Sequence, residues 1–236
     1  MLRRLLFAAV LAPAIFCVAA SAQSVDEVVN KHIEARGGID KIKALKSLKM
    51  AGTAMIGPGL EAPFTMHLKR PGSMHMELAI QGKSFVQATD GSAPWMINPF
   101  TGSPDPQAMP AEDAKDVEQQ ADFDGPLVDF KAKGNSVELL GKEDFEGTEV
   151  YKLKVTLKGG DVQYVYLDAG SFLQLKETTK RVRDGKEMEF ESVSSNYKAV
   201  EGVQFPFSLE TKANGQPQFA LTLTAIEANK PIDDSI

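Results

Sequence analysis

The chain has 236 residues, of which 43% are hydrophobic and 25% are charged, and its formal net charge at pH 7 is −6. These proportions are typical of a globular protein and exclude the collagen-like and intrinsically disordered classes. The acidic balance also argues against nucleic acid as a partner, and no stripe of basic residues interrupts it.

The first 22 residues have the three parts of a secretory signal peptide. Arg3 and Arg4 form a short basic region, residues 5–18 form an apolar core, and Ala20-Ser21-Ala22 is a small-x-small cleavage site. Cleavage after Ala22 predicts an exported chain, residues 23–236, that forms a single domain. Cys17 leaves with the signal peptide, so we expect no thiol, disulfide or thiolate–metal chemistry in the mature protein.

The mature N-terminus has the pattern of a helix. Ser24 followed by Glu27 is a capping box, which marks a helix start, and Gly37-Gly38 marks the end. The apolar stripe between them consists of Val28, Val29 and Ile33. A second, shorter helical segment is expected next, with Ile42, Leu45 and Leu48 apolar.

From about residue 49 the hydrophobic period changes to two, which predicts strands. Six apolar side chains alternate with polar ones in two adjacent runs: Phe64, Met66, Leu68, Met74, Met76 and Leu78. If the two runs pair antiparallel with these side chains on one face, Met66 opposes Met76 and Leu68 opposes Met74. This register leaves Arg70-Pro71-Gly72 as a three-residue hairpin loop, with Gly72 expected in the left-handed conformation.

Further strand-like runs follow, separated by Gly-containing turns. The runs are Val150–Lys158, Val162–Asp168, Leu173–Arg183, Lys186–Val200, Phe205–Thr211 and Gln218–Ala228, and the turns include Asp90-Gly91, Glu146-Gly147, Asp184-Gly185 and Glu201-Gly202. Residues 99–133 are the exception, because they are rich in proline and then predict a helix over Ala111–Ala121 and another beginning at Pro126. The expected fold is mainly β: one curved antiparallel sheet, with an N-terminal helix and a mid-chain helical insertion over its concave face.

Catalytic signatures are absent from the sequence, and no metal or cofactor is expected. His67 and His75 are cross-strand neighbours in the inferred register, so two imidazoles could hold Zn²⁺ or Cu²⁺; without a third ligand, solvated strand-face histidines are the simpler interpretation. An exposed helix face and the exit from that helix are expected for the acidic residues Glu112, Asp113, Asp116, Glu118, Asp122 and Asp124.

The apolar side chains give a weaker but positive signal. The mature chain keeps eight methionines, and methionine suits surfaces that accept flexible apolar ligands. We therefore predict that the six residues of the two runs, together with Trp95 and Met96, line an apolar ligand cavity. The same residue types also make up any packed β core, and the sequence leaves both interpretations open.

The order of short motifs resembles the LolA/LolB-like periplasmic lipoprotein-carrier superfamily, in particular its outer-membrane lipoprotein-sorting members. The matching stretches are Glu34-Ala35-Arg36-Gly37-Gly38, Asp90-Gly91 before Trp95-Met96-Ile97-Asn98-Pro99, Leu140-Gly141-Lys142 with Phe145-Glu146-Gly147, Tyr166-Leu167-Asp168, and Val200-Glu201-Gly202-Val203-Gln204-Phe205-Pro206. The resemblance covers almost the whole mature chain.

This resemblance implies an unclosed β-barrel with helices at its mouth, a periplasmic location, and a cavity that takes lipoprotein acyl chains or another lipid. It implies partners among the inner- and outer-membrane components of lipoprotein transfer, and no catalytic residue, metal or cofactor. The family's lid-latching arginine finds no obvious equivalent. Two other functions remain open: a lipid- or lipoprotein-sensing module without transport, and a hydrolase built on the same scaffold.

Overall fold

The computed structural model describes residues 23–57, 59–101, 105–183 and 186–233. The predicted signal peptide and the Asp184-Gly185 turn lie outside the described residues. The helices are α1 (Val25–Ala35), α2 (Ile39–Ala44) and α3 (Ala111–Ala121). The strands are β1 (Ser47–Ile56), β2 (Leu60–Lys69), β3 (Ser73–Ile80), β4 (Lys83–Thr89), β5 (Trp95–Ile97), β6 (Gln107–Ala108), β7 (Ser136–Phe145), β8 (Thr148–Thr156), β9 (Val162–Asp168), β10 (Gln174–Arg183), β11 (Lys186–Val200), β12 (Val203–Ala213) and β13 (Gln216–Ala228).

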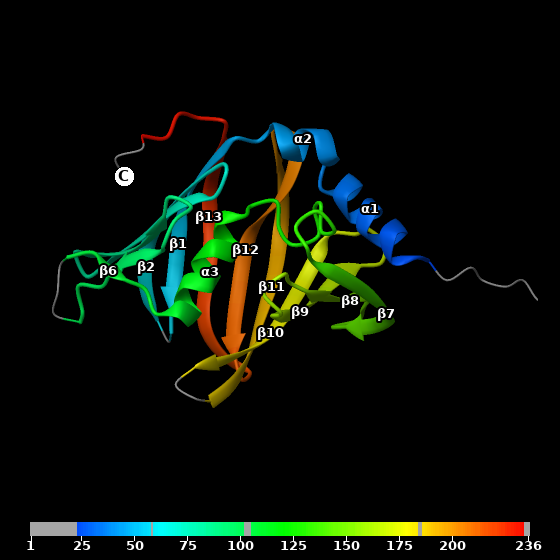
Figure 1. Cartoon of the computed structure of the whole chain (residues 1–236). Helices are drawn as coiled ribbons and strands as arrows, with labels where there is room; N and C mark the ends of the chain where they lie inside the picture. Colours follow the sequence, from blue (N-terminus) through cyan, green and yellow to red (C-terminus); the bar gives the residue numbers. More distant parts are fainter. Residues whose placement is uncertain (1–22, 58, 102–104, 184–185, 234–236) are drawn as a thin grey trace, which may run out of the picture.

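All the strands belong to one antiparallel sheet with the order β6-β5-β4-β3-β2-β1-β13-β12-β11-β10-β9-β8-β7. Most neighbours are consecutive in sequence, and the long-range contact is β1 against β13, which joins the two halves of the chain. Within the described strands, β6 and β7 end the sheet and do not pair with each other, so the barrel is unclosed. Figure 1 shows the sheet curving around α3, with α1 and α2 at one end of the same face. The predicted fold class is confirmed.

The N-terminal helix forms as its sequence predicts. The Ser24 hydroxyl accepts a hydrogen bond from the Glu27 amide, and the Glu27 carboxylate accepts one from the Ser24 amide, which completes the capping box. Val28 and Val29 are buried against strand residues that include Leu153 and Val165. The helix α1 therefore covers the inner face of the sheet at its β7–β9 end.

The β2–β3 hairpin has the predicted register. Met66 pairs with Met76, Leu68 with Met74, and Lys69 with Ser73, which leaves a three-residue loop. The loop conformation differs from the prediction: the Arg70–Pro71 peptide is cis, and Gly72 does not have a positive φ. The reversal is therefore made without the left-handed glycine that the sequence suggested.

The segment after α3 differs from the prediction too. Residues 126–134 form a series of turns in place of a second helix, although Leu127 and Val128 are buried as expected for its apolar positions. Asp129 and Gly134 have positive φ values of 53° and 79°, which an α-helix does not allow.

At the other edge of the sheet, β7 contains a bulge. The register with β8 shifts between Leu139 and Gly141, so Leu140 has no partner and its side chain is 49% exposed. Within the part of the chain that is described, no helix is long and apolar enough to cross a membrane.

Candidate functional site

The predicted ligand-binding ladder lies on the concave face. In the antiparallel pairing of β2 with β3, Phe64 lies opposite Leu78, Met66 opposite Met76, and Leu68 opposite Met74. The six side chains therefore share one face. Five of them are buried in the main apolar cluster, and Met66 is partly exposed beside it. Helix α3 contributes Val117 and Ala121 to the same cluster. The ladder is therefore covered by α3, and ligand binding there remains a prediction.

Trp95 and Met96, which the sequence places together in this lining, lie on opposite faces. Met96 pairs with Gln87, which pairs with Met76 of the ladder. Trp95 pairs with Ala88, which pairs with His75 on the other face. Because side chains alternate along a strand, Met96 shares the ladder's face and Trp95 does not.

Helix α3 is held over the sheet by few apolar contacts. The residue before it, Pro110 at the N-cap position, supplies no side-chain cap, and within α3 only Val117 and Ala121 are buried. Two ion pairs join its polar side to the other half of the sheet: Asp116 with Arg181 of β10, and Lys115 with Asp161 at 3.5 Å. The strands that α3 contacts most are β3 and β4, and in the view of Figure 1 the helix is drawn in front of β13.

The loop that follows α3 is fixed much more firmly, through Asp124. This carboxylate is 2% exposed and accepts hydrogen bonds from Arg70, at 2.5 and 2.8 Å, and from Lys43, at 3.1 Å. Burial alone would raise the pKa of Asp124, but the bonds from Arg70 and Lys43 outweigh it and the pKa is lowered. The carboxylate is thus held ionised.

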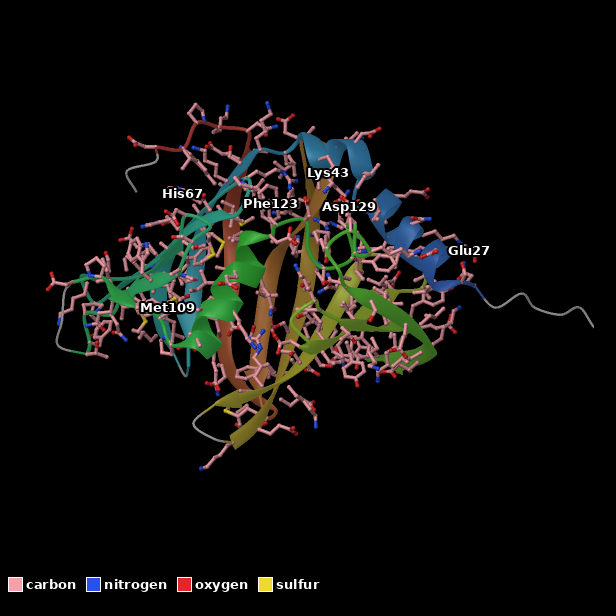
Figure 2. The ribbon with its side chains drawn as sticks, viewed as in Figure 1. Glu27, Lys43, His67, Met109, Phe123 and Asp129 are labelled. Carbon is pink, nitrogen blue, oxygen red and sulfur yellow. The ribbon has the colours of Figure 1, made fainter. Side chains whose placement is uncertain are left out.

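Arg36, at the end of α1, reinforces the same loop. Its guanidinium donates to the carbonyl oxygen of Asp124 at 2.5 Å and to that of Phe123 at 3.5 Å. The Arg70 guanidinium lies 4.5 Å from the centre of the Phe123 ring. Figure 2 shows Phe123 directly after α3, with Lys43 and Asp129 close together nearby, and the Lys43–Asp129 ion pair measures 2.6 Å. We call Arg36, Lys43, Arg70 and Asp124 the loop anchor.

This anchor corrects the interpretation of residues 112–124 as an exposed acidic face. Asp124 is buried, and the Asp116 side chain is only 18% exposed. Burial raises the pKa of Asp116, against the opposing effect of Arg181. No local pattern signals these burials, because the basic partners come from α1, α2, the β2–β3 loop and β10.

A cavity of about 270 Å³ opens beneath the loop anchor. Its apolar walls include Met50, Leu68, Phe123 and Phe205, and its polar walls include His32, Gln120, Gln174, Ser194 and Tyr197. Burial lowers the pKa of His32 to about 4, although its Nδ1 lies 2.8 Å from the Phe172 carbonyl oxygen. Burial raises the pKa of Tyr197 to about 12. Both groups are therefore uncharged at neutral pH, and the charged side chain among the residues that line this cavity is Arg36. We call this space the inner cavity.

A second, larger hollow, the polar groove, runs between α3 and strands β9 and β10. It measures about 790 Å³ and is continuous with a deeper recess of about 270 Å³ that shares Lys115, Asp161, Glu177 and Arg181. Its walls are mostly charged or amide side chains. No sequence motif marks this groove, because its residues are scattered over five segments of the chain.

On the opposite face of the sheet, His67 and His75 pair across strands as predicted, with ring centroids 6.3 Å apart. The Nδ1 atom of His67 is buried, and none of the residues that the structure describes forms a hydrogen bond with it. Among the described residues, no group of three or more His, Cys, Asp or Glu side chains gathers as a metal site would require. In this part of the chain, no side chain joins the pair as the third ligand that a Zn²⁺ site needs.

Comparison with known proteins identifies the fold. No protein-family model matches the sequence, and no curated protein matches it. Among solved structures, a LolA superfamily protein from Nitrosomonas europaea has a TM-score of 0.60 at 14% identity, over 91% of this chain and 97% of that chain. An outer membrane lipoprotein-sorting protein domain from Vibrio parahaemolyticus has a TM-score of 0.59 at 12% identity, over 89% and 94%. A DUF1329 family protein from Desulfovibrio piger has a TM-score of 0.62 at 11% identity, over 89% and 95%. The resemblance drawn from the sequence motifs is confirmed at the level of fold: this chain has a LolA-like fold.

Proposed function

We propose that the protein binds the acyl chains of lipoproteins, or of other lipids, between α3 and the concave face, and carries them across the periplasm toward the outer membrane. The observation that carries this proposal is the ladder of flexible apolar side chains covered by a helix that buries only Val117 and Ala121 against it. The LolA-like fold, the predicted signal peptide and the structural similarity to a lipoprotein-sorting domain support it.

The free energies of apolar burial favour the replacement of α3 by a ligand on the ladder. Burial of one Val and one Ala side chain contributes about 2–4 kcal/mol. Burial of an acyl chain of about sixteen carbons is favourable by about 0.8 kcal/mol per CH₂, or about 12 kcal/mol in all. Displacement of α3 from the ladder would therefore cost much less than the binding of one chain returns.

The test compares two substitutions at adjacent positions on opposite faces of β2. Met66→Glu places a carboxylate on the ladder, where Met66 is partly exposed, whereas Thr65→Glu places one on the exposed outer face. We expect both variants to remain folded by thermal unfolding. Binding of a fluorescent fatty acid should fall at least tenfold in Met66→Glu and stay unchanged in Thr65→Glu.

A folded Met66→Glu variant that binds the fatty acid like the wild type would contradict the assignment of the ladder as the lipid-binding surface. An unfolded variant would favour a packed core, and Met66→Gln then repeats the test without a charge. Mass spectrometry of lipid that co-purifies intact would separate a binding protein from a hydrolase. Extraction of lipoproteins from inner-membrane vesicles would separate a carrier from a sensor.

A further inference from the structure

The polar groove and the inner cavity meet at α3, where Gln120 lines both. On one side of Gln120 lie Met50, Leu68 and Phe205 of the apolar cluster. On the other side lie the charged walls of the groove. The two spaces together therefore have the polarity of an amphiphile, with an apolar part and a polar part next to each other.

The charges in the groove balance. Six basic and six acidic side chains line it: Lys43, Arg70, Lys115, Lys133, Lys158 and Arg181, and Asp116, Glu118, Asp122, Asp124, Asp161 and Glu177. Most of them already pair with each other, as Arg181 does with Asp116, Lys133 with Asp122, and Arg70 with Asp124. A wall without excess positive charge gives little attraction to a ligand with net negative charge.

Glu177, on β10, is the acid in the groove best placed to receive a cation. The side-chain nitrogen of Gln174 lies 3.5 Å from one oxygen of the Glu177 carboxyl group. When the Gln163 amide is oriented with its nitrogen toward Glu177, this nitrogen lies 3.0 and 3.3 Å from the two oxygens. Among the described residues, no basic side chain forms an ion pair with it. Burial raises the pKa of Glu177, against the effect of Arg181. A bound ammonium group next to this carboxyl would favour its ionised form and pair with it.

Lys115 of α3 faces the same 270 Å³ recess as Glu177. Its amine lies 3.5 Å from Asp161, and the two side chains are 56% and 45% exposed, so this ion pair is weak and exchangeable. In this recess, Lys115 can therefore bind an anionic group and Glu177 a cationic group of the same ligand. Its volume equals that of about nine water molecules, close to the roughly eight non-hydrogen atoms of a phosphoethanolamine group.

We propose that the polar groove binds the zwitterionic headgroup of an ethanolamine phospholipid, with its ammonium at Glu177 and its phosphate at Lys115. This inference rests on the proposed function, since the acyl chains of the same lipid would occupy the apolar side of α3. It names the class of lipid that the site selects: zwitterionic lipids over anionic ones.

The experiment titrates the full mature chain with soluble short-chain lipids by isothermal calorimetry. The probes are dihexanoyl phosphatidylethanolamine, which is zwitterionic, dihexanoyl phosphatidylglycerol, which is anionic, and a fluorescent fatty acid, which has no such headgroup. The wild type should bind the ethanolamine lipid about tenfold more tightly than the glycerol lipid. Glu177→Gln should abolish this preference and leave fatty-acid binding unchanged, and the exposed Glu61→Gln should change neither.

Lys115→Gln provides the second arm, because it should weaken binding of both phospholipids by a similar factor. Equal affinity of the wild type for the two phospholipids would overturn the inference, as would a Glu177→Gln variant that keeps the preference. In either case, retained fatty-acid binding would leave the proposed function standing. Loss of fatty-acid binding in the wild type would instead refute the proposed function itself.

Discussion

The carboxylate of Asp124 is held by both terminal nitrogens of the Arg70 guanidinium, at 2.5 and 2.8 Å, in a place where Asp124 is 2% exposed. The same guanidinium also donates to the backbone carbonyls of Leu45 and Ile42, at 2.7 and 3.1 Å. One side chain thus ties the β2–β3 hairpin to the end of α2 and to the loop after α3. Helix α3 is therefore anchored at its C-terminal end and weakly held along its length.

Asp124→Asn should destabilise the protein by about 2–4 kcal/mol, because it leaves the charges of Arg70 and Lys43 without their buried partner. Chemical denaturation at pH 7 measures this. Asp26→Asn is the control, since its pair with Lys131 is 54% and 70% exposed and should cost less than about 1 kcal/mol. Equal losses in the two variants would show that the Asp124 network does not stabilise the fold.

His32 should make the protein less stable in mild acid. Its folded-state pKa of about 4 lies below the usual 6.5, so its contribution is fully present above pH 6.5 and is lost as the pH falls toward 4. The loss should reach about 2–3 kcal/mol by pH 4.5. Denaturant unfolding at pH 7.5 and pH 4.5 should show a smaller difference for His32→Gln than for the wild type.

The same comparison with His75→Gln, a histidine on the outer face, controls for the change of residue type. An identical pH dependence in the wild type and His32→Gln would contradict the assignment of the acid response to this buried imidazole.

Residues 99–133 should behave as a lid. We expect fast amide hydrogen exchange in α3 of the empty protein, because few of its side chains are buried, and slower exchange with a bound fatty acid. Arg181→Gln removes the tie to Asp116 and should speed exchange in α3, whereas Lys180→Gln breaks only an exposed pair with Glu187 and should not. Strong, uniform protection of α3 without ligand would indicate a rigid insertion.

The chain isolated from the periplasm should begin at Gln23. Intact-mass analysis would show this directly, because removal of residues 1–22 shifts the mass by the whole predicted signal peptide. A chain that retains Met1, or that carries lipid on Cys17, would rule out this processing.

Local patterns in the sequence are enough to predict the β2–β3 pairing and the strands β8 to β13, whereas β6 and β7 lie outside the predicted runs. The Met66–Met76 register follows from alternation alone, since a slip of one residue would turn Met66 and Leu68 away from the core. The capping box at Ser24 and Glu27 likewise depends only on nearby residues. Such features need no knowledge of the rest of the chain.

The loop anchor and the polar groove could not be predicted in this way. Arg70 and Asp124 are 54 residues apart, and nothing near Asp124 distinguishes it from the exposed acids before it. Alternation along β5 already places Trp95 and Met96 on opposite faces. Which of the two faces the ladder depends on the register of β4 with β5, and the Asp90-Gly91 turn alone does not specify it. Contacts between distant segments are decided by the packing of the whole sheet.

The bulge at Leu140 has a consequence for the behaviour of the protein at high concentration. An unclosed sheet leaves the backbone amides and carbonyls of its last strand available, and a long regular edge invites a second molecule to extend the sheet. The unpaired residue distorts this edge, and the charged side chains of Glu138, Lys142 and Asp144 stand along it. The protein can thus keep an open barrel without offering a template for fibrous aggregation.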